Sequence, residues 1–138
     1  MPTNNELKYL SERRLSAVQV LTDNSLHDIA YHDSGYIIEF GLKAIICKKS
    51  GSEEYPSSKE YYTHHFDSLV RLAGLEEELA IKKATDREFM KNWSVATKWS
   101  VQLRYRPIGH DDKSIVESFI NAIRSDKGGV LPWLKLHW

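Results

Sequence analysis

The segment "LHDIAYHDSGYIIEFGLKAIICKK", residues 26–49, decides the fold of this chain. At 100° per residue its apolar and small residues share one broad face, which comprises Ala30, Tyr31, Ser34, Gly35, Ile38, Gly41, Leu42, Ile45 and Ile46. This pattern predicts a long helix that ends at about Lys49, and Ser25 with Asp28 offers a capping box at its start. The small residues on the face would let another helix approach closely.

Helical periodicity continues through most of the remaining chain. It predicts helices over about 6–21, 65–73 and 75–84, a helix opened by a Thr85/Glu88 capping box, a helix over 112–124 and a last turn from Pro132. The predicted inward residues of the later helices are Phe89, Met90, Trp93, Ala96, Ile115, Phe119, Ala122 and Ile123. No segment alternates with a period of two, so the sequence predicts an all-α, antiparallel up-and-down bundle of four to five helices.

Length and composition indicate one domain. The chain has 138 residues and a formal net charge of zero, so any polyanion site must be a local patch. We expect a single domain over 1–138, with residues 1–5 flexible and residues 50–60 forming a loop. A single cysteine, Cys47, and the lack of a signal-peptide core or a membrane-length apolar run predict a cytoplasmic protein.

The long helix resembles the signature helix of the HEPN (higher eukaryotes and prokaryotes nucleotide-binding) domain family. The shared positions are Ala30, Tyr31, Gly35, Glu39 and Lys43, the last two forming a Glu-x-x-x-Lys pair. "HHFDSLVRLAGL", residues 64–75, resembles the family's His-Asp-Leu segment, although Phe66 follows His65. "LRYRP", residues 103–107, resembles the Arg-Tyr-Pro turn before the last long helix, although Arg106 separates Tyr105 from Pro107.

The resemblance covers roughly residues 7 to 125 and implies a helical bundle, commonly homodimeric, that works on RNA or nucleotides. Some members are metal-independent ribonucleases, often in toxin-antitoxin or defence systems, with an Arg-x(4 to 6)-His motif. Others bind nucleotides beside a small nucleotidyltransferase partner. We therefore expect a homodimer through the apolar, small-residue face of one or two long helices, with no cofactor and no metal.

Within "LRYRPIGHDD", residues 103–112, Arg104 and His110 match the ribonuclease spacing. A histidine can move the proton of a ribose 2′-hydroxyl, and a guanidinium can stabilise charge on the attacked phosphate. Alternatively, Arg104 and Arg106 clamp phosphate and Tyr105 stacks on a base without any chemistry. A structural alternative pairs Arg104 with a helix-borne acid such as Glu39 and packs Tyr105 into the core.

Two further groups of residues have a structural and a functional interpretation. Glu39 and Lys43 have the favoured spacing for a helical ion pair. Alternatively, they join His32 and Tyr36 on a flank that faces a cleft closed by the Arg104 loop, where they contact a nucleotide or RNA. His64 and His65 suggest a helix start more than a metal site, and the four tryptophans suggest core or dimer contacts. Three functions stay open: a nucleotide- or RNA-binding module, a metal-independent endoribonuclease, and a helical protein-interaction module.

Overall fold

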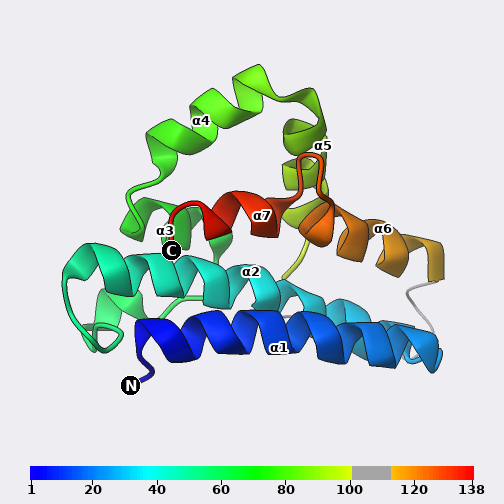
Figure 1. Ribbon diagram of the computed structural model, residues 1–138, viewed down its shortest axis with the longest axis horizontal. Helices are drawn as coiled ribbons and strands as arrows, with labels where there is room; N and C mark the ends of the chain where they lie inside the picture. The colour runs from blue at the N-terminus through cyan, green and yellow to red at the C-terminus, as the bar shows by residue number, and fades with distance from the viewer. Residues whose placement is uncertain (101–112) are drawn as a thin grey trace.

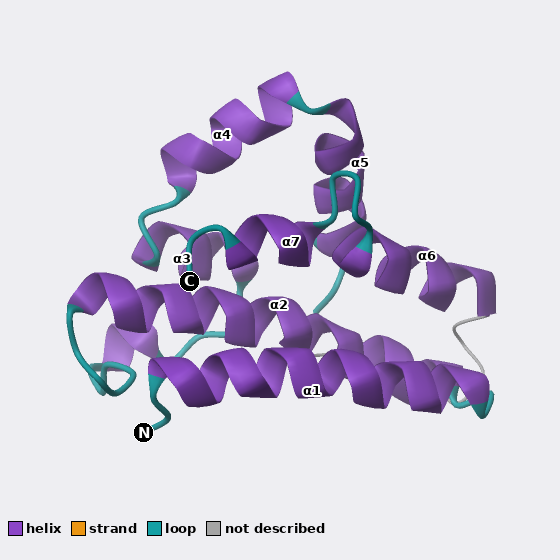
Figure 2. Ribbon diagram, viewed as in Figure 1, coloured by secondary structure: helices purple, strands orange, loops and turns teal. Residues whose placement is uncertain are grey.

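Two long helices lie side by side and run antiparallel. The computed structural model describes residues 1–100 and 113–138. Within those ranges it contains α-helices and one short 3₁₀ helix, and no strand (Figures 1 and 2). α1 (Asn4–Asp23) packs along α2 (His27–Ser50), and the bounds of α2 agree closely with the helix expected from the sequence. The prediction of an all-helical bundle is confirmed.

The remaining elements are shorter and gather around α2. They are η1 (Lys59–Tyr61), α3 (Phe66–Leu72), α4 (Glu76–Thr85), α5 (Arg87–Ala96), α6 (Lys113–Arg124) and α7 (Val130–Lys135). α2 contacts α1, α3, α6 and α7, whereas α4 lies at the outer edge and packs on α5 (Figure 1). Among the described residues, no helix has the length and apolar character needed to cross a membrane.

The core is centred on α2 because this helix is covered on most sides. Its fully buried residues include Ile37, Ile38, Leu42 and Ile46. The other helices contribute the large side chains Leu7, Val18, Leu69, Phe89, Phe119, Ile123 and Leu134. Trp93, Trp99 and Trp133 are also buried within the chain, so they contribute to its own core, as one of the two alternatives predicted.

The small-residue face of α2 is covered by side chains of the same chain. A Cβ atom on Gly35 would lie 1.9 Å from Cε2 of Trp99, and one on Gly41 would lie 3.0 Å from Cδ1 of Leu134. The space next to Gly35 is therefore filled by the indole ring of Trp99 and not by a neighbouring helix. The space next to Gly41 is filled by a side chain of α7. Within this chain these two positions are thus already occupied, and the homodimer expected from the sequence stays a prediction.

Two of the predicted helix caps are wrong. Ser25 adopts a positive φ of 61°, and Leu26 is the N-cap residue of α2, so Ser25 and Asp28 form no capping box. A positive φ lies outside the extended conformation that an N-cap residue typically adopts. The N-cap residue of α5 is Asp86 instead of Thr85, and its side chain accepts a hydrogen bond from the backbone N–H of Phe89 at 3.0 Å.

Two residues predicted to face the core are exposed. Met90 is 47% exposed because α5 is an outer helix that buries one narrow face through Phe89 and Trp93. Ile115 is 46% exposed, and Val116 is buried in its place. The hydrophobic period alone does not determine which of two adjacent residues faces the core. In α6 the contacts with α2 and α5 decide this.

The predicted loop over residues 50–60 is tied to the N-terminus and to α2. Tyr55 is buried, its backbone N–H donates to the carbonyl of Pro2 at 2.7 Å, and its hydroxyl donates to the carbonyl of Tyr61 at 2.9 Å. Thr3 forms a capping box with Glu6 at the start of α1. These bonds hold the segment that leads to His64 and His65 in place beside α2.

Candidate functional site

One flank along the middle of α2 stays partly exposed beside the buried face of the helix. We call it the α2 flank, and it comprises His32, Tyr36, Glu39 and Lys43, the four residues that the sequence places together. His32, Tyr36 and Lys43 are half-buried, and Glu39 is 1% exposed. Neighbouring elements add Arg14 from α1, Trp99 from the segment after α5, and His64 from the segment before α3.

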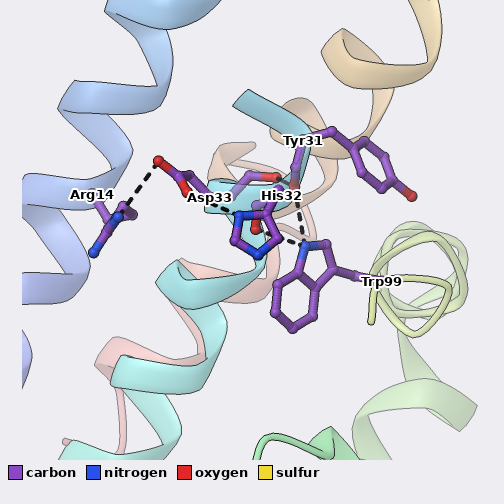
Figure 3. Close-up of polar contacts among 6 residues, drawn as sticks. Arg14, Tyr31, His32, Asp33 and Trp99 are labelled. Carbon is purple, nitrogen blue, oxygen red and sulfur yellow. Dashed lines mark hydrogen bonds and ion pairs between the residues drawn. The ribbon is translucent and has the colours of Figure 1, made fainter. Parts of the chain in front are cut away.

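At the first end of the flank, polar groups of α1 and α2 meet. The guanidinium of Arg14 lies 3.5 Å from a carboxylate oxygen of Asp33, and the other oxygen of Asp33 lies 3.2 Å from Nδ1 of His32 (Figure 3). The ion pair is partly exposed, so it contributes little to stability. Its effect is to hold Arg14 and the His32 ring at the edge of the helix pair.

Trp99 closes the side of the flank opposite Arg14 (Figure 3). Its indole N–H donates to the backbone carbonyls of Tyr31 and His32, both at 3.0 Å. The ring stacks on Phe66 with a centroid distance of 5.5 Å and lies over Gly35. Any side chain at position 35 would collide with the ring. Trp99 can therefore occupy this position only because residue 35 is a glycine.

Aromatic rings line the middle of the flank. Tyr36 stacks on Phe40 at 5.8 Å and meets His32 edge-on at 5.4 Å. The guanidinium carbon of Arg14 lies 5.4 Å from the ring centroid of Tyr36 and 5.8 Å from that of Phe40. Both distances are within the range of a cation–π interaction. The flank therefore combines a cation with half-buried rings.

The second end of the flank is built on a buried carboxylate. Oε1 of Glu39 is 3.0 Å from Nζ of Lys43 and 2.5 Å from Nδ1 of His64. The ion pair predicted from the spacing of Glu39 and Lys43 is thus confirmed. Oε2 of Glu39 is also buried and has no hydrogen-bond partner within residues 1–100 and 113–138. The His64 side chain, in contrast, is 53% exposed.

Tyr55 covers this second end from the loop. The ammonium of Lys43 lies 5.5 Å from the Tyr55 ring centroid. Burial raises the pKa of the Tyr55 hydroxyl well above its usual value, and the negative charge of Glu39 raises this pKa further. Tyr55 therefore stays protonated at physiological pH and acts as a hydrogen-bond donor to Tyr61, not as a proton carrier.

A small cavity of about 140 Å³ lies beside His64. It is lined by His64, His65, Phe66, Asp67, Thr97, Trp99 and Ser100. Phe66 and Trp99 are buried and give it an apolar floor, while the two imidazoles and Asp67 belong to exposed residues at its rim. No group of three His, Cys, Asp or Glu side chains in the described ranges is arranged to hold a metal ion.

The structure brings together part of the predicted site. Glu39 and Lys43 are paired as described above, whereas Arg104, Tyr105, Arg106 and His110 lie outside the described residues. The ribonuclease motif, the phosphate clamp and the pairing of Arg104 with Glu39 consequently stay predictions.

Sequence reasoning missed Arg14 and underestimated His64. Arg14 belongs to a different helix, and His64 is separated by 25 positions from Glu39, to which it binds. Contacts between elements this far apart leave no period in the sequence. The one available signal was that two adjacent histidines precede a short helix in an otherwise polar segment.

Comparison of the chain with protein families, with curated proteins and with solved structures finds no match.

Proposed function

We propose that this chain is a nucleotide- or RNA-binding module with a HEPN-like fold, and that the α2 flank contacts the ligand. The observation that supports this best is the position of the Arg14 guanidinium over the Tyr36 and Phe40 rings, next to His32. Cationic and aromatic side chains along one groove are the combination that binds single-stranded nucleic acid, because bases stack on rings and phosphates pair with cations.

The charge of the flank is balanced at neutral pH. Arg14 and Lys43 are offset by Asp33 and Glu39, which pair with them. Affinity for a polyanion must therefore come from local geometry and not from net charge, in agreement with the neutral chain. A protonated histidine on the flank or beside it would add positive charge.

Arg104, Tyr105, Arg106, Glu39 and Lys43 remain the residues predicted from the sequence to contact the nucleotide or RNA. The proposal includes a homodimer and a small nucleotidyltransferase partner, as in a toxin-antitoxin or defence system. In the alternative of a metal-independent endoribonuclease, Arg104 stabilises charge and His110 transfers the proton. No contact within the described residues favours this alternative over binding, and none favours a protein-interaction module.

Fluorescence anisotropy with a labelled single-stranded RNA of mixed sequence tests the proposal. We expect Arg14→Ala to weaken binding and to reduce the slope of log K against log salt by roughly 0.7, the value for one phosphate contact on a single strand. Arg13→Ala is the matched control, because Arg13 is the exposed neighbour of Arg14 and lies over Tyr9, away from α2.

Equal losses in the two variants would contradict a specific role for the α2 flank. No RNA binding and no nucleotide binding by the wild-type protein would contradict the proposed function itself. RNA cleavage in the presence of EDTA, lost in His110→Ala, would support the ribonuclease alternative instead.

A further inference from the structure

We propose that the cavity beside His64 binds a phosphate group, that protonated His64 is the residue that holds the phosphate, and that Glu39 positions the His64 ring. The identity of the ligand, a phosphate carried by a nucleotide or by RNA, rests on the proposed function. The site itself rests on the contacts of described residues. Neither His64 nor His65 is among the binding residues predicted from the sequence.

The geometry of the Glu39 contact leaves one nitrogen of His64 available. An ionised carboxylate can only accept hydrogen bonds, so Nδ1 of His64 donates to Oε1 of Glu39 at 2.5 Å. Nε2 is then the nitrogen left to meet a ligand. It carries a hydrogen and donates when the ring is protonated, and it is an acceptor when the ring is neutral.

The buried carboxylate fixes the orientation of an otherwise exposed ring. Glu39 is 1% exposed and cannot turn away, since Lys43 holds the same oxygen at 3.0 Å. The His64 side chain is 53% exposed, so without this bond its ring would have several accessible rotamers. A carboxylate that orients an imidazole in this way is a common device at sites that bind or transfer charged groups.

The charges around the cavity make binding depend on the histidines. The groups of α2 that face His64 are Glu39 and Lys43, whose opposite charges cancel. The loop contributes the neutral Tyr55, and α3 contributes the negative Asp67. The segment after α5 contributes only uncharged residues, Thr97, Trp99 and Ser100. With neutral imidazoles, these described groups together carry one negative charge and repel an anion. When His64 and His65 are both protonated, they carry one positive charge and attract it.

The lining also favours a phosphate over a larger ligand. At about 140 Å³ the cavity accommodates a group of a few heavy atoms. Phe66 and Trp99 shield one side from water, which strengthens a hydrogen bond between charged groups. A nucleotide would place its phosphate here while its base remains outside the cavity.

Histidine side-chain NMR measures this site directly. Inorganic phosphate is titrated into the wild-type protein at about pH 5.5 and about pH 8, on either side of the range in which histidine ordinarily changes its charge. We expect the Nε2 resonance of His64 to shift with phosphate at the lower pH, and affinity to fall by roughly tenfold or more at the higher pH, the effect of one charge-assisted hydrogen bond.

Three variants separate the binding residue from the positioning residue. His64→Gln should weaken phosphate binding at the lower pH and reduce its dependence on pH, to which His65 still contributes. His137→Gln, which changes a histidine on the segment after α7, should leave phosphate binding unchanged. In Glu39→Gln the His64 side chain is still present, but its ring is no longer held by a carboxylate. The His64 ring resonances should therefore broaden, and phosphate binding at low pH should weaken. Because Glu39 is buried, thermal unfolding is measured in parallel, and His64→Gln is decisive if Glu39→Gln does not fold.

The source of the phosphate is tested with two further probes, AMP and a short RNA with a 5′-hydroxyl end. Binding of AMP alone at His64 indicates a terminal phosphate, and binding of both indicates that an internal phosphodiester is accepted. An unshifted His64 resonance at low pH, or wild-type phosphate binding by His64→Gln, overturns the inference. If RNA and AMP fail to bind while inorganic phosphate still shifts His64, the proposed function fails and the phosphate site stands.

Discussion

Replacing Gly35 by alanine should destabilise this protein far more than the same change at Gly41. Both glycines lie inside α2, where alanine would be favoured by about 1 kcal/mol if nothing were in the way. At Gly35, however, the new Cβ would lie 1.9 and 2.0 Å from two ring carbons of Trp99, whereas ordinary contact begins at 3.4 Å. The indole must therefore move.

The expected magnitude follows from what Trp99 loses. Overpacking a well-packed core costs about 1–3 kcal/mol. The two hydrogen bonds from the indole N–H to the carbonyls of Tyr31 and His32 are worth about 1 kcal/mol each. After the gain in helix propensity is subtracted, Gly35→Ala should lower the free energy of unfolding by roughly 2–4 kcal/mol. Gly41→Ala, with 3.0 Å to one terminal carbon of Leu134, should change it by at most about 1 kcal/mol.

Chemical denaturation of four variants tests this reasoning: Gly35→Ala, Gly41→Ala, Trp99→Ala, and Gly35→Ala combined with Trp99→Ala. Once the indole is absent, Gly35→Ala has nothing to displace and should be neutral or slightly stabilising. The cycle should therefore show a coupling energy of several kcal/mol. Similar losses at Gly35 and Gly41, or additive effects in the cycle, would refute the assignment of Gly35 as the position that admits Trp99.

Two other predictions concern charge. Asp33→Asn removes the carboxylate that competes for Arg14, so RNA should bind several-fold more tightly. Unchanged affinity in anisotropy measurements would argue against Arg14 as a phosphate contact. The pKa of Asp86 is lowered first by the hydrogen bond from the backbone N–H of Phe89 and then by the bond to Lys82. A lowered folded-state pKa means that this stabilisation is present above the usual Asp value of 3.8 and is lost as the pH falls through the folded-state pKa. The melting temperature of the wild type should consequently drop more steeply on acidification below this value than that of Asp86→Asn, which keeps a capping side chain without a titratable group; parallel curves would contradict the role of the charged cap.

The site could be predicted in part because part of it lies on one helix. His32, Tyr36, Glu39 and Lys43 are spaced by three or four residues, and this spacing alone places them on one flank. The pairing of Glu39 with Lys43 follows from the same geometry and is present in the structure. The burial of Glu39 could not be inferred in this way, because it depends on how other segments pack against α2.

Helix positions were predicted well, and their rotations and caps less well. α2 was located from its apolar face, yet Ser25, Met90 and Ile115 were assigned roles that the structure contradicts. A hydrophobic period determines that a segment is helical and roughly which face is inward. It does not determine the exact edge of that face, which depends on the neighbouring helices and on the turns that join them.

By itself, the sequence determined that this chain is an all-helical bundle and that α2 carries a polar flank, because both properties follow from local periodicity along the backbone. The tertiary structure decided that Trp99 occupies the space at Gly35, that Arg14 lies over Tyr36, and that Glu39 holds His64. Each of these contacts joins segments far apart in the chain. Such contacts arise from the packing of whole elements, which no local pattern of residue types encodes.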